Sequence, residues 1–102
     1  ILNKMVLPKP GDGPSEKKMK DGFFKMKIIG FANEVTKIGV NVAGDSDPGY
    51  SATAKMLAEA AISILLDEKK IPNTYGVLTP ASGIGLILID RLKDKGISFE
   101  VD

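Results

Sequence analysis

The sequence predicts an α+β fold, in which an antiparallel β-hairpin is followed by two packed helices and a short C-terminal strand. Two neighbouring runs alternate apolar and polar residues around a short polar turn, which is typical of a hairpin. Two later stretches have apolar residues at helical spacing. A chain of 102 residues forms one domain at most, and 43% hydrophobic with 26% charged residues is ordinary for a globular protein.

Residues 1–22 are predicted to be an irregular loop segment that precedes the α/β segment of residues 23–102. Three prolines and two glycines stand between Leu7 and Pro14, and both residue types interrupt regular structure. Ser15 can cap a short helical turn that runs through Asp21 and ends at Gly22.

The hairpin is predicted from Phe23 to Phe31 and from Val35 to Val42, with its turn near Asn33-Glu34. The apolar side chains of the two runs share one face, and lysines point the other way. An isolated hairpin is marginal in water, so the apolar face needs a cover. We expect the next helix to cover the side chains of Met26, Ile28, Val40 and Val42.

The first long helix is predicted from Tyr50 to Glu68, because this stretch lacks internal Gly and Pro and is rich in good helix formers. One face carries an apolar stripe, which we expect to be buried: Ala54, Leu57, Ala58, Ala61, Ile64 and Leu65.

The second helix is predicted to begin at Thr79-Pro80, with Thr79 as the N-cap, and to run to about Lys95 before Gly96. Ile97 to Val101 follows as a closing strand. The two helices together carry more apolar surface than one hairpin and one strand can cover, so we expect part of it to meet another domain or a second chain.

Composition excludes several classes of function. The chain has no Cys and no His, which removes disulfides, thiolate catalysis and the commonest general base and zinc ligands, so no metal site is expected. Residues 1–27 carry a charge of +4 and the remainder −3, without the basic and aromatic pattern of nucleic-acid binding. No membrane span and no signal peptide are visible, which favours a cytoplasmic over a secreted location.

Three stretches, in this order and at this spacing, resemble the C-terminal end of the saccharopine dehydrogenase-like oxidoreductases, a family that includes trans-acting enoyl reductases. They are Pro10–Ser15, Gly44–Tyr50 with its continuation Thr53–Ala61, and Gly76–Ala81 leading a helix that ends in Gly96–Val101. The resemblance implies a larger α/β enzyme whose N-terminal Rossmann domain binds NAD or NADP. A chain that starts at Ile1 fits a trimmed or partial protein.

The chain itself has no convincing dinucleotide motif, so no cofactor-binding residue is expected in it. Gly83-Ile84-Gly85 is the nearest match to a phosphate-binding turn, but Leu88 stands where the third glycine belongs. We interpret these glycines as a close-packed helix start.

The candidate substrate-binding residues lie at the start of the first long helix: Asp47, Tyr50, Thr53 and Lys55. A helix N-terminus offers free N–H groups, to which these side chains add hydroxyls and an ammonium. The alternative is that Asp45, Ser46 and Asp47 cap the helix, that Tyr50 packs on the hairpin and that Lys55 pairs with Glu59. The catalytic residues cannot be identified.

The leading functional hypothesis is the C-terminal part of an NAD(P)-dependent oxidoreductase, inactive alone, that contributes substrate-side or assembly surface. The alternative is a non-catalytic module for protein interaction or oligomerisation. The expected partner is therefore the missing Rossmann domain or a second copy. The sequence does not identify the substrate, the choice between NAD and NADP, or the oligomeric state.

Overall fold

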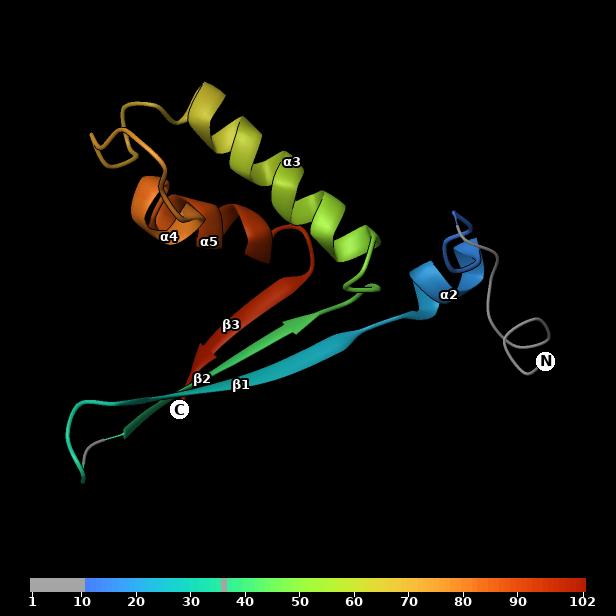
Figure 1. Cartoon of the computed structure of the whole chain (residues 1–102), viewed down its shortest axis with the longest axis horizontal. Helices are drawn as coiled ribbons and strands as arrows, with labels where there is room; N and C mark the ends of the chain where they lie inside the picture. Colours follow the sequence, from blue (N-terminus) through green and yellow to red (C-terminus); the bar gives the residue numbers. More distant parts are fainter. Residues whose placement is uncertain (1–10, 36) are drawn as a thin grey trace.

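A computed structural model describes residues 11–35 and 37–102. It shows a three-stranded antiparallel sheet in the order β1-β2-β3, with helices packed over one end (Figure 1). The elements are α2 (Glu16–Asp21), β1 (Phe24–Phe31), β2 (Lys37–Gly44), α3 (Ser51–Leu66), α4 (Pro80–Gly83), α5 (Leu86–Lys93) and β3 (Ile97–Val101). The predicted α+β class, with hairpin, helices and closing strand, is confirmed. The predicted loop of residues 1–22 is described only from Gly11 onward, where Ser15 caps α2 through the amide of Lys18, as expected.

The hairpin is in register across its full length, from the pair Phe24–Gly44 to the pair Phe31–Lys37. Its turn includes Asn33 and Glu34, as predicted, while residue 36 lies outside the described part. β3 pairs with the other edge of β2, from Gly44–Ile97 to Val40–Val101.

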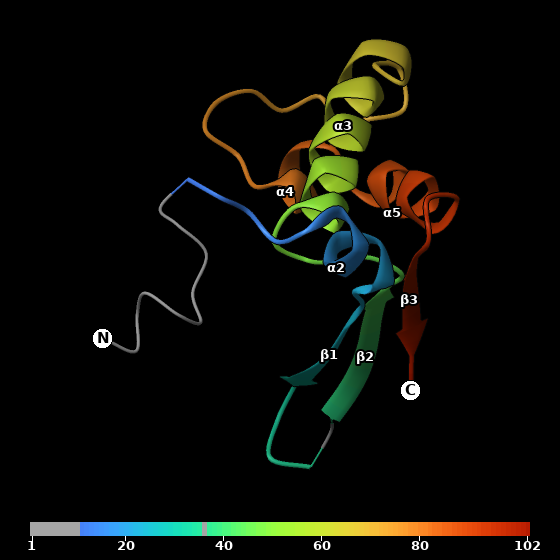
Figure 2. The same ribbon diagram turned by 90° about the vertical axis from the view of Figure 1, so that its right-hand side faces the viewer.

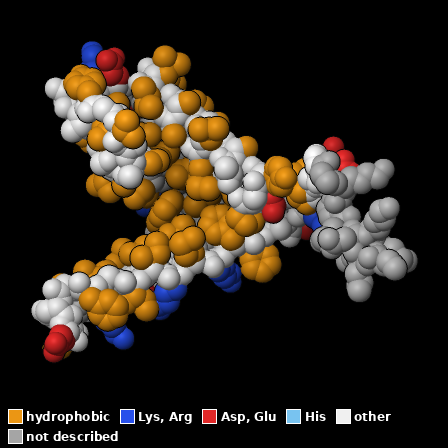
Figure 3. Space-filling model, in the orientation of Figure 1, with side chains coloured by type: hydrophobic (Ala, Val, Ile, Leu, Met, Phe, Trp, Pro, Cys, Tyr) orange, Lys and Arg blue, Asp and Glu red, His pale blue; other side chains and the backbone are white. Residues whose placement is uncertain are grey.

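The two faces of the sheet differ sharply in chemistry. Directly opposed residues share a face, so the rows Phe24–Gly44–Ile97, Met26–Val42–Phe99 and Ile28–Val40–Val101 make one side almost wholly apolar. The other side carries the lysines of β1, and there Lys27 forms an ion pair of 2.6 Å with Asp102. Figure 3 shows this division, with hydrophobic atoms on the helix side of the strands and lysines below.

The prediction that the first long helix covers the apolar face of the hairpin is wrong for most of that face. Met26 is 55% exposed and Ile28 is 49% exposed. Val40 and Val42 are half-buried. The helices cover only the end of the sheet at Ile97, and the sheet and the helix layer diverge from there (Figures 1 and 2).

α3 forms where predicted, but the prediction of its buried side is wrong. All six residues of the expected apolar stripe are exposed, including Leu57 at 73% and Leu65 at 77%. The buried residues lie on the opposite side of the helix: Ala52, Glu59 and Ser63. The reason is a polar clamp to α5, in which the buried Glu59 accepts a 2.7 Å hydrogen bond from Arg91. Arg91 also reaches Asp67 at 3.2 Å, just beyond α3.

The second predicted helix is divided into α4 and α5. Gly85 adopts φ 72°, a left-handed value that ends one helix before the next begins, and this explains the difference from the single helix expected. Thr79 caps α4 by accepting from the amide of Ser82, as predicted. The small core joins α4–α5 to β3 through Ile84, Leu88, Leu92 and Ile97.

Candidate functional site

The loop before α3 is held together by Asp47. Its carboxylate accepts from the amide of Tyr50 at 2.8 Å, and its carbonyl accepts from the amide of Ala52 at 2.8 Å. Its own amide donates to the carbonyl of Met19 at 3.2 Å, which ties α2 to this loop. Asp47 therefore organises the loop before the helix. The N-cap position of α3 is Tyr50 and no side chain caps this helix, so the expected capping by Asp45, Ser46 and Asp47 is wrong.

Thr53 and Lys55 are also engaged in local contacts. The hydroxyl of Thr53 donates to the carbonyl of Pro48 at 2.5 Å. The ammonium of Lys55 lies 2.6 Å from the carboxylate of Asp45, and this hydrogen bond is the main cause that lowers the pKa of Asp45 below its usual 3.8. The predicted pair between Lys55 and Glu59 is wrong, because Glu59 points inward to Arg91.

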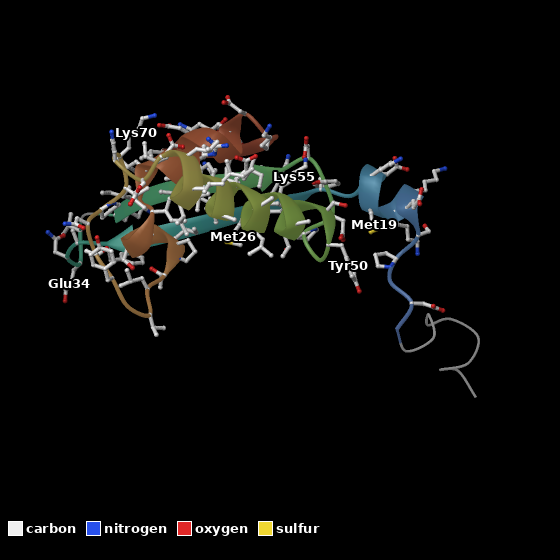
Figure 4. All side chains as sticks on the ribbon, turned by 90° about the horizontal axis from the view of Figure 1, so that it is seen from above. Met19, Met26, Glu34, Tyr50, Lys55 and Lys70 are labelled. Carbon is white, nitrogen blue, oxygen red and sulfur yellow. The ribbon has the colours of Figure 1, made fainter. Side chains whose placement is uncertain are left out.

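Tyr50 lies apart from Lys55. The ring of Tyr50 lies over Gly13, with its Cζ 3.4 Å from the point where a side chain would begin there. Tyr50 is 55% exposed, and Figure 4 shows Tyr50 and Lys55 on opposite sides of the start of α3. The four candidate residues thus share one end of α3 but do not converge on one point. Within the part of the chain described, Tyr50 alone among them has a polar group that no local contact uses.

A hollow of about 900 Å³ lies at the other end of α3, where the chain turns into α4. Its lining is mainly apolar and includes Ile64, Ile71, Leu78 and Ile84. Tyr75 lies at the same hollow, and its hydroxyl donates to the side chain of Asn73 at 2.7 Å. This size suits a small ligand or one segment of a longer apolar group. The sequence gives no signal for this hollow, because an irregular connection forms much of it and no periodic pattern reveals the path of that connection.

The geometry around Gly83-Ile84-Gly85 agrees with a helix junction. Gly83 ends α4 and Gly85 precedes α5, so this turn joins two helices, whereas a phosphate-binding turn of the dinucleotide type joins a strand to a helix. The sheet of residues 24–101 is antiparallel throughout, whereas dinucleotide-binding folds use parallel strands.

Two further classes of site are absent from the described ranges 11–35 and 37–102. No group of three or more acidic side chains there is placed to hold a metal ion. No helix of these ranges combines the length and the apolar character needed to cross a bilayer.

Comparison with known proteins finds relatives among mycobacterial enoyl reductases. The chain is 36% identical over 99 residues to a Mycobacterium tuberculosis protein named "Putative trans-acting enoyl reductase", and the match covers 97% of this chain and 24% of that protein. It is 33% identical over 92 residues to the trans-acting enoyl reductase of Mycobacterium ulcerans, covering 90% and 22%. It is 32% identical over 96 residues to that of Mycobacterium bovis, covering 94% and 23%.

The chain therefore spans about a quarter of the length of the curated relatives it matches. No family model matches it, and no solved structure matches it.

Proposed function

We propose that the chain is the C-terminal part of an NAD(P)-dependent enoyl reductase-like oxidoreductase and that it supplies substrate-side or assembly surface. The observation that carries this proposal is the 36% identity over 97% of the chain to a protein named as an enoyl reductase, of which the chain spans only 24%. The resemblance to saccharopine dehydrogenase-like enzymes is the basis for naming a nicotinamide cofactor and a Rossmann domain, which would lie in sequence outside this chain.

The chemistry implied is the reduction of a carbon–carbon double bond next to an acyl carbonyl. A hydride goes to one carbon of the double bond and a proton to the other, and the reduced nicotinamide supplies the hydride. The antiparallel sheet and the helix junction at Gly83–Gly85 support a nucleotide site elsewhere, since neither provides a strand–turn–helix cradle for a pyrophosphate.

Two features of this chain can serve the substrate. Tyr50 presents a phenol on the surface at the start of α3, where a hydroxyl can hydrogen-bond an acyl carbonyl. The hollow beside Ile71 and Leu78 offers apolar walls for an aliphatic portion. Asp47, Thr53 and Lys55 support the fold of that region and contact substrate only if their present hydrogen bonds are exchanged.

The test joins these 102 residues to the rest of the M. tuberculosis relative, in place of that protein's own matched quarter. We expect the joined protein to consume NADH or NADPH with an α,β-unsaturated thioester, and Tyr50→Phe to lower the turnover. Control reactions contain the unmodified relative and the isolated chain. A joined protein that folds but stays inactive, beside an active relative, overturns the proposal.

A second measurement tests whether the nucleotide site lies outside this chain. Calorimetric titration of the isolated 102 residues with NADH and with NADPH should give no binding tighter than about 100 µM, roughly −5.5 kcal/mol. Tighter binding would mean that this chain contains a nucleotide site, which contradicts the proposal that the site lies outside it.

The second candidate function is a non-catalytic interaction module. The outward-facing apolar side of α3 favours it, because large exposed apolar surfaces on proteins tend to mark contacts.

A further inference from the structure

The side of α3 that faces away from α5 is the most unusual surface of the chain. We call it the outer stripe of α3, and it consists of Ala54, Leu57, Ala58, Ala61, Ile64 and Leu65. All six residues are exposed. Figure 4 looks onto the helix layer from the side away from the sheet, and Figure 3 shows hydrophobic atoms along this helix.

The stripe carries no charge, because both charged residues of α3 lie outside it. Lys55 is paired with Asp45, and Glu59 is buried against Arg91. A solvent-facing helix surface normally has the reverse distribution, with charges outside and leucines inside. The orientation of α3 is thus suited to a partner that covers its outer side.

The spacing of the stripe fits an α-helix as that partner. Positions 54, 57/58, 61 and 64/65 repeat with steps of three and four, which is the pattern that packs one helix along another. The alanines at 54, 58 and 61 allow the two backbones to approach closely, while Leu57 and Leu65 supply the larger contacts.

A second copy of this chain is a poor fit as the source of that helix. A helix of 16 residues is about 24 Å long and about 10 Å wide, so its stripe offers about 240 Å² in projection. If side-chain roughness doubles this area, the stripe still offers less than the roughly 800 Å² that each partner buries in a stable interface.

The exposed part of the sheet does not add to the same contact. The exposed side chains of Met26, Ile28 and Val101 share the apolar face of the sheet. This face borders the opening beneath the helix layer (Figures 1 and 3), so the helix layer lies between it and the far side of α3. One two-fold axis joins one contiguous patch to itself, so a single second copy cannot cover both surfaces. A longer polypeptide can, and the relatives are about four times as long as the matched part.

We propose that the outer stripe of α3 seats an α-helix supplied by the part of the longer protein that lies outside these 102 residues. The inference rests on the proposed function, in which the chain is a segment of a larger oxidoreductase. It adds which surface of the segment meets the remainder and which kind of element meets it.

The test is cysteine labelling, which the absence of Cys from this chain makes clean. Leu57→Cys and Leu65→Cys probe the stripe, and Lys93→Cys is the matched control on an exposed part of α5. In the dilute isolated chain, all three should react with a maleimide at similar rates. In the chain joined to the rest of the M. tuberculosis relative, the two stripe positions should slow by about tenfold or more while position 93 is unchanged.

Equal labelling of all three positions in the joined protein overturns the proposal. Slowing in the isolated chain that grows with concentration, without slowing in the joined protein, overturns it in favour of a second copy. If the joined protein does not fold, the three substitutions are made at the aligned positions of the unmodified relative. Their maleimide labelling rates are then compared in the same way.

Reductase activity is measured on the same samples, so the two proposals fail separately. If the stripe is protected but the enoyl thioester is not reduced, the proposal of a helix-binding stripe stands and the proposed reductase function is overturned. If the thioester is reduced but Leu57→Cys is not protected, the reductase function stands and the helix-binding stripe is overturned.

Discussion

Removal of the Arg91 guanidinium should destabilise the chain strongly, because it leaves the buried carboxylate of Glu59 without its closest partner. The side chain of Glu59 is 7% exposed and lies 2.7 Å from Arg91, while the nearest other cation, on Lys95, is 3.9 Å away. Asp67, the second partner of Arg91, keeps its ion pair with Lys70 at 2.8 Å, so the cost is assigned to Glu59. Breaking a buried pair from one side costs about 3–5 kcal/mol. Arg91 is itself 28% exposed, so water reaches the site and the lower figure of about 3 kcal/mol applies to Arg91→Ala.

That loss is large against the total stability, which is about 5–15 kcal/mol for a chain of this length. The assay is urea unfolding of the isolated chain at neutral pH and low micromolar concentration, followed by circular dichroism. Lys93→Ala is the matched control, since it removes an exposed cation from the same turns of α5 and should change stability by less than about 0.5 kcal/mol. If Arg91→Ala is no worse than Lys93→Ala, the clamp does not hold α3 to α5 as argued.

Three further predictions concern pH, one glycine and association. The pKa values of Asp45, Asp67 and Asp102 lie below 3.8, chiefly through hydrogen bonds from Lys55, Lys70 and Lys27. The stability that they contribute is complete above that pH and is lost as the pH falls through their lowered pKa values. The urea midpoint should therefore drop below pH 3.8, and Asp102→Asn should remove part of the drop. Gly96→Ala should cost about 1–3 kcal/mol, because a positive φ strains alanine and its Cβ would overlap the carboxylate of Asp45. Gly30→Ala, where space is open, should be close to neutral by the same unfolding assay. The isolated chain should self-associate through the exposed apolar face of its sheet, which carries Met26 and Ile28, so sedimentation equilibrium should give a mass above 10.9 kDa that rises with concentration. A strict monomer that leaves the fluorescence of an apolar dye unchanged would contradict this.

Features set by neighbouring residues could be predicted from the sequence. The hairpin follows from alternation, α3 from the lack of Gly and Pro, and the cap of α4 from Thr79 before Pro80. Each depends on contacts within a few residues. The break at Gly85 could not be predicted, because a glycine inside a helical pattern is compatible with both a continuous helix and a junction.

The sequence predicted where the candidate residues lie, at the start of a helix, but not what their side chains bind. Asp47 and Thr53 were correctly placed at the start of a helix, but whether their oxygens serve the backbone or a ligand depends on the exact path of the loop. Tyr50 was expected to be free for substrate or to pack on the hairpin, and its place beside Gly13 depends on a loop with no periodic signal.

The inward side of α3 could not be predicted, because periodicity identifies an apolar side and not the neighbour that covers it. The helix has two usable sides: one apolar, and one that combines Ala52, Met56 and Ala60 with Glu59 and Ser63. What selects between them is Arg91, which lies 32 residues beyond Glu59. The alternation within α3 carries no information about a residue so far along the chain.

The Arg91–Glu59 pair contributes to orientation as well as to stability. A buried ion pair is often replaced by apolar residues of similar volume without loss of stability, so stability alone does not account for it. With Glu59→Leu and Arg91→Met combined, we expect most of the stability lost in Arg91→Ala to return. Both sides of α3 would then be apolar, and nothing would keep the outer stripe outward. Leu57→Cys should consequently label more slowly in this background than with the clamp intact, while Lys93→Cys keeps its rate. Unchanged labelling of Leu57→Cys would mean that the remaining contacts of α3, and not the ion pair, set its rotation.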